Sequence, residues 1–383
     1  MLELKKIITV KKLFLLLGFF LLYFLLFLKP YVELYEGSWQ MEIDFAEEIV
    51  SQYGTALLPE EFEQLKGKKP VYEAGKTDIF IEQNPEYAAF NVHSLKELMN
   101  LSGSRVLSLE EDNRLWFKLY EGVSSEVVGE DMERLILFDI WDYYIESYEQ
   151  AGQGGRQYEN LTPQAERRVE ERNGKEVYSP LPSNVTEYNF ELLRFFAVFM
   201  MLSTTFFVMP YMVSENRSRM PALQYSFRKG RSYYKNRMTA VVITVLCIAA
   251  AECALYLYCA GIDRVFAFWN CSLSGFASGF IGWLPWTLGS YTVCVLLLMV
   301  LASVGLSLIV FAITNYLSSH VSAIAWQIPV AVFSCVYGGL ACFKLGEIDK
   351  PMLAAPAVGI GVFAVGILLA FVQGQREKKK DAV

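Results

Sequence analysis

Six long apolar stretches constrain this chain more than any other feature. Each is close to the ~20 residues that an α-helix needs to cross about 30 Å of hydrocarbon. Lipid offers no hydrogen-bond partners to the backbone, and a helix satisfies its own. The sequence therefore predicts an all-α polytopic membrane protein with six transmembrane helices, at residues 13–28, 190–212, 238–260, 291–313, 321–342 and 353–373.

The first stretch follows a segment, residues 1–12, that mixes four lysines with apolar residues. Such a segment suits the membrane surface. A basic start before an apolar run is also typical of a secretory signal peptide, which ends in small residues that a peptidase can cleave. This run ends instead in Leu28, Lys29 and Pro30. We therefore expect an uncleaved anchor, with a cleaved signal peptide as the alternative.

Basic residues collect on one side of the predicted bilayer. The loop 213–237 contains seven cations and one acid, Glu215, and the basic tail 374–383 adds four more cations. Short loops rich in lysine and arginine stay in the cytoplasm. We therefore expect a multi-pass protein with this loop and both termini in the cytoplasm.

Residues 29–189 differ in composition from the rest of the chain. Between positions 30 and 187 there are 32 acidic and 14 basic side chains, a balance of −18, whereas the remainder carries +11. Apolar residues such as Leu135, Phe138 and Trp141 recur there at helical spacing. None of the seven cysteines lies in this region, so its stability must come from packing and not from disulfides. We expect a mainly helical extracytoplasmic domain between the first and second spans.

Residues 261–290 are too interrupted by glycine and proline for a stable span, and too apolar for a free loop. Tryptophan favours the membrane interface, and irregular backbone near lipid must be shielded by protein. We expect an outer hairpin that is interfacial or re-entrant. The alternative is an aromatic collar on the fourth helix.

The sequence contains no pattern that predicts catalysis or a metal site. Cys247, Cys253 and Cys259 are spaced more widely than paired zinc ligands, which usually lie two to four residues apart. His93 is the one histidine in residues 29–189, too few for a multi-histidine site. The glycine-rich loop with lysine that cradles nucleotide phosphates is also absent from the sequence. We expect no catalytic residue, metal or cofactor in this chain, and no nucleic-acid partner.

Three polar side chains within the spans are functional candidates, because burying them in lipid is costly. Glu252 lies about 21 Å along the third span at ~1.5 Å per residue, a depth that Arg194 on the second span shares. We predict that these two pair across antiparallel helices, with Glu191 just above them. A structural pair is favoured over a substrate or proton site. Gln327 on the fifth span is a weaker pathway candidate, with a hydrogen bond between helices as the alternative.

The order of residues in the loop carries the functional signal. An acid follows the second span, then come a leucine, a hydroxyl residue, a Gly-Arg step and a lysine that enters the third span. These positions are Glu215, Leu223, Ser226, Gly230, Arg231 and Lys235. In this order the loop resembles the corresponding loop of type-2 ABC transporter permeases. The layout of one span, a large external domain and five clustered spans is similar to that family too.

The resemblance implies a permease subunit of an ATP-driven exporter in a bacterial cytoplasmic membrane. Its loop 214–237 would dock into a separate cytoplasmic ATP-binding subunit, which would hold the ATP and Mg²⁺, and residues 1–12 would form a second contact. Permeases of this kind work in pairs, so a second copy or a homologue is expected. The alternative is a non-transporting membrane anchor or receptor whose acidic external domain binds a ligand or partner.

Overall fold

The computed structural model describes residues 2–29, 38–104, 106–152, 162–217, 233–262, 264–278, 280–314, 320–348 and 351–379. Most of this described part is helical, and its strand-like elements are two isolated β-bridges. The chain divides into two compact units. Glu36–Arg156 form one, here called the head unit; Met1–Tyr35 and Gln157–Val383 form the other, the membrane unit.

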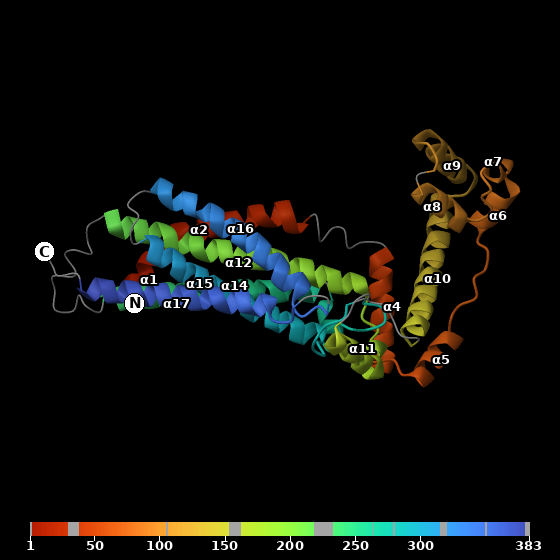
Figure 1. The fold of residues 1–383 in the computed structure, drawn as a ribbon. Helices are drawn as coiled ribbons and strands as arrows, with labels where there is room; N and C mark the ends of the chain where they lie inside the picture. Colours follow the sequence, from red (N-terminus) through yellow and green to blue (C-terminus); the bar gives the residue numbers. More distant parts are fainter. Residues whose placement is uncertain are drawn as a thin grey trace. The chain divides into compact units, whose positions relative to one another are not determined.

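Six helices of the membrane unit, among the described residues, are long and apolar enough to cross a bilayer. They run side by side in a bundle (Figure 1) and coincide with the six predicted spans, so the predicted fold class is confirmed. They are α2 (Val10–Tyr23, continued by the π-helix η1, Phe24–Leu28), α12 (Ser183–Arg217), α14 (Tyr233–Ile262), α15 (Leu288–Thr314), α16 (His320–Lys344) and α17 (Ala354–Lys379).

Close helix packing holds the bundle together. α12 and α15 are its most buried members, and α15 packs against α12, α14 and α17. Where α15 meets α17, a Cβ atom added to Gly366 would lie 2.5 Å from the carbonyl oxygen of Gly305. Small residues let helix backbones approach in this way inside a membrane. α2 joins α12 through aromatic rings instead: the ring centre of Phe199 lies 5.5 Å from that of Phe19 and 5.1 Å from that of Tyr23.

The described residues of the head unit are mainly helical, as predicted for the domain between the first two spans. The helices between residues 76 and 122 gather near one end of the long helix α10 (Figure 1). Tyr87 and Leu119 are fully buried in the core between these elements. The helices are α4 (Ser38–Tyr53), α5 (Pro59–Gly67), α6 (Lys76–Gln83), α7 (Pro85–Ala88), α8 (Leu95–Gly103), α9 (Leu109–Gly122) and α10 (Ser125–Gly152).

Segments outside the six membrane helices form a cap at the end of the bundle where α12 begins, here called the cap end. The cap comprises α11 (Pro163–Lys175), η2 (Glu176–Tyr178), residues 264–290 with η4 (Val265–Phe268), and residues 345–348. Residues 264–290 double back on themselves through a bridge between Ser272 and Thr287. A second bridge joins Gly282 to Glu347. The segment is therefore folded back on itself and tied to the chain between α16 and α17, while its predicted outer, interfacial or re-entrant placement stays a prediction.

The boundaries of the predicted external domain differ from the observed division. The prediction placed residues 29–189 in one domain, but α11, η2 and the start of α12 pack with the membrane unit. Composition suggested otherwise because this stretch is polar, yet polar residues before the apolar core of α12, such as Asn184 and Thr186, are buried.

Candidate functional site

The loop between α12 and α14 carries the predicted coupling motif, and much of it lies outside the described residues. Leu223, Ser226, Gly230 and Arg231 are all in that portion. The backbone of Glu215 belongs to the last turns of α12, and Lys235 is exposed in the first turn of α14. Two long membrane helices therefore lead directly into the two ends of the motif. We call this the loop end of the bundle.

The N-terminal segment predicted as a second contact packs at the same end. The short helix α1 (Leu2–Ile7) lies against α14 and α12, and Ile7 is fully buried. The Lys12 ammonium donates to the carbonyl oxygen of Ile7 at 3.1 Å. α1 and the two helices that flank the loop are therefore one packed group.

Arg237, four residues into α14, is buried at the loop end with 2% of its surface exposed. Its guanidinium carbon lies 5.2 Å from the ring centre of Tyr233, 5.7 Å from that of Tyr211 and 5.9 Å from that of Phe311. Nη2 also donates to the sulfur of Met212 at 2.9 Å. A desolvated cation against aromatic faces contributes about 2 kcal/mol or more. Arg237 thus joins the loop-end turns of α12, α14 and α15.

Two hydrogen-bonded pairs link α12 to its neighbours within the bundle. Oγ of Ser203 lies 2.7 Å from Oε1 of Glu252 on α14. On α16, Gln327 accepts a hydrogen bond at 3.2 Å from the hydroxyl of Thr205. The contact between helices that we considered for Gln327 is therefore present. The Glu252 side chain is enclosed, with 5% exposed, and within the described part of the chain its Oε2 has no hydrogen-bond partner.

The predicted pair between Arg194 and Glu252 is wrong. Arg194 forms its ion pair with Glu191, three residues earlier on the same helix. The Glu252 carboxyl is hydrogen-bonded to Ser203 instead. A neighbour one turn away on the same helix is within reach without any constraint on how two helices are rotated, and such local pairs form readily.

A polar network at the cap end was not foreseen from the sequence. Asn189 on α12 donates from Nδ2 to the Thr292 hydroxyl on α15 at 3.0 Å, and it accepts a hydrogen bond from the Tyr256 hydroxyl on α14. All three residues are fully buried. Their mutual contact depends on the rotation of three helices, which single-residue patterns do not reveal.

Two buried arginines of α11 hold the cap together, and no pattern in the sequence singled them out. Arg168 donates from Nε to the carbonyl oxygens of Gly282 and Trp283, each at 3.1 Å, and pairs with both carboxylate oxygens of Glu176 at 2.8 and 2.6 Å. Arg172 donates from Nε to the carbonyl oxygen of Ser274 at 2.9 Å. Hydrogen bonds of a charged donor are stronger than neutral ones. Within the cap, α11 is therefore fastened to a segment that lies more than 100 residues further along the sequence.

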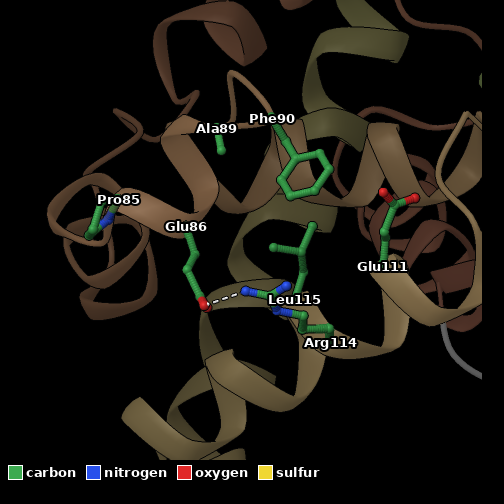
Figure 2. Close-up of a pocket in the computed structure, with 7 residues that line it drawn as sticks. All are labelled: Pro85, Glu86, Ala89, Phe90, Glu111, Arg114 and Leu115. Carbon is green, nitrogen blue, oxygen red and sulfur yellow. Dashed lines mark hydrogen bonds and ion pairs between the residues drawn. The ribbon is translucent and has the colours of Figure 1, made fainter.

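The head unit has a shallow hollow of about 450 Å³ between α7 and α9 (Figure 2). Phe90 and Leu115 give it an apolar wall, and Arg114 pairs with Glu86 at 2.7 Å across one side. This hydrogen-bonded pairing lowers the pKa of Glu86 below its ordinary value. Because Arg114 and Glu86 are already paired with each other, the hollow offers an apolar surface more than a charged binding site.

The described residues contain no cluster of three or more histidine, cysteine or acidic side chains that could hold a metal ion. All seven cysteines are free thiols in the structure. Comparison with known proteins finds no match to a family model, to a curated protein or to a solved structure.

Proposed function

We propose that this protein is the membrane-spanning permease subunit of an ATP-driven transporter of the ABC class, acting as an exporter in a bacterial cytoplasmic membrane. The observation that carries the proposal is the loop 214–237, whose residue order resembles the coupling loop of type-2 permeases. Its position between two long membrane helices, α12 and α14, agrees with that role. The insertion of the head unit between the first two membrane helices fits the same layout.

The geometry at the loop end suggests how such a subunit would work. A partner ATPase that grips the loop would move it as a rigid body when the nucleotide sites close. The force would enter α12 and α14 together, because Arg237 and α1 already join these helices. α15 would follow through Phe311, the third ring beside Arg237. ATP and Mg²⁺ would bind to the partner, and a second permease copy or a homologue would complete the transporter.

The test is co-purification of the tagged chain from its native membrane, followed by assay of ATP hydrolysis. The wild-type chain is expected to retain a partner that carries a phosphate-binding loop and hydrolyses ATP. Arg231→Glu should lose that partner. Arg376→Glu, which reverses an exposed charge on the C-terminal helix, should keep it.

Two outcomes would count against the proposal. Loss of the partner from both variants would mean that bulk positive charge, and not the motif, is recognised. Absence of any ATPase from the wild-type preparation would favour the alternative, a non-transporting anchor or receptor that acts through the head unit.

A further inference from the structure

The carboxyl group of Glu252 has an unusual set of neighbours for an acid inside a membrane protein. Oε1 lies 2.7 Å from Oγ of Ser203, and Oε2 has no hydrogen-bond partner in the described part of the chain. The side chain is 5% exposed and sits within the apolar part of α14, ten residues before that helix ends at Ile262. An isolated carboxylate in such a place would be very costly.

The Ser203 hydroxyl has two oxygen atoms within hydrogen-bond distance and a single proton to donate. Oγ of Ser203 lies 2.7 Å from Glu252 Oε1 and also 3.1 Å from the carbonyl oxygen of Met200. A hydroxyl carries one proton, and a carbonyl oxygen and a carboxylate are both acceptors only. Each contact has its own proton if the Ser203 hydroxyl donates to the carbonyl oxygen of Met200 and a protonated Glu252 carboxyl donates to the Ser203 oxygen. That arrangement requires a proton on Glu252.

The charged and titratable groups nearby do not balance a negative charge on the Glu252 carboxylate. Arg194, the nearest cation on α12, forms its ion pair with Glu191. Tyr23 on α2 donates its hydroxyl proton to the carbonyl oxygen of Phe195 at 3.0 Å. On α14 itself the adjacent titratable residue is Cys253. In the described residues no cation lies within ion-pair distance of Glu252.

We infer that Glu252 and Ser203 form an intramembrane proton-binding site, in which Glu252 holds a proton that it donates to the Ser203 hydroxyl. The ligand of the site is the proton itself. The inference rests on the contacts at α12 and α14 and does not depend on the proposed transport function.

The test is infrared difference spectroscopy of the purified full-length chain at neutral pH. Glu252→Gln is expected to remove one C=O stretching band of a protonated carboxylic acid. Glu191→Gln makes the same chemical change at an acid that is ion-paired with Arg194, so it should remove carboxylate absorption and leave the acid band in place. Raising the pH of the wild-type sample should convert the acid band into carboxylate absorption.

Ser203→Ala tests the same site without changing the acid. It removes the acceptor of the Glu252 proton, so the acid band should remain and move to higher frequency. The inference is overturned if Glu252→Gln removes carboxylate absorption instead of the acid band. It is overturned as well if Ser203→Ala leaves the band unmoved, and this second measurement stands even if Glu252→Gln fails to fold.

Discussion

The crossing of α15 and α17 allows a quantitative test of the bundle. A Cβ atom at Gly366 would lie 2.5 Å from the carbonyl oxygen of Gly305 and 3.0 Å from its Cα atom, and backbone cannot swing aside. Forcing one extra carbon into packed space costs about 1–3 kcal/mol. Gly361, on the same helix, has no atom within 4 Å of its added Cβ. Alanine is favoured over glycine in a helix by up to about 1 kcal/mol at either position.

Because the propensity gain is common to both variants, it cancels between them. Gly366→Ala is therefore expected to be less stable than Gly361→Ala by about 1–3 kcal/mol. The assay is equilibrium unfolding of both full-length variants in the same detergent, followed by far-ultraviolet circular dichroism. Gly361→Ala should match or exceed the wild-type stability. Equal stability of the two variants would refute the close α15–α17 crossing.

Two further predictions concern the cap and the head unit. Arg168→Met should destabilise the cap by about 3–5 kcal/mol, because it leaves the Glu176 carboxylate without its buried partner. Limited proteolysis should cut the cap faster in this variant than in Arg167→Met, which changes an exposed neighbour. Equal cleavage of the two variants would contradict the fastening role of Arg168. Ser108→Ala should weaken α9 by about 1 kcal/mol through loss of its N-cap. Hydrogen bonds from Ser108 lower the pKa of Glu111 in the folded protein. The stability that Glu111 gains from them is therefore fully present above the pKa of Glu111 in the unfolded chain, and it is lost as the pH falls through the lowered pKa of the folded state. The urea midpoint of the variant should thus depend less on acid pH than that of the wild type, and an unchanged pH profile would refute the capping assignment.

The membrane helices could be predicted from sequence because lipid imposes a simple demand on length and polarity. The start of α12 was placed at position 190, whereas the helix begins at Ser183. Polar residues such as Asn184 look like an external loop, and only their burial by tertiary contacts makes them part of the packed helix. Composition cannot report such contacts.

Side-chain partners were the least predictable part. Depth in the membrane could be estimated for Glu252 and Arg194, and it suggested a pair, but helix rotation decides the partner and it brings Ser203 to Glu252. The role of Arg168 could not be predicted from sequence, since its backbone partners lie more than 100 residues further along the chain. A local motif such as the loop 214–237 can be recognised from sequence because it is defined by the order of neighbouring residues.

The sidedness of the loop is the most direct test of the whole account. In a cysteine-free background, Arg228→Cys is placed in the loop and Lys68→Cys on the exposed surface of the head unit. With a membrane-impermeant maleimide, intact cells should label Lys68→Cys, while Arg228→Cys should react only after the membrane is permeabilised. Labelling of Arg228→Cys in intact cells would place the loop outside, where no cytoplasmic ATPase could bind it.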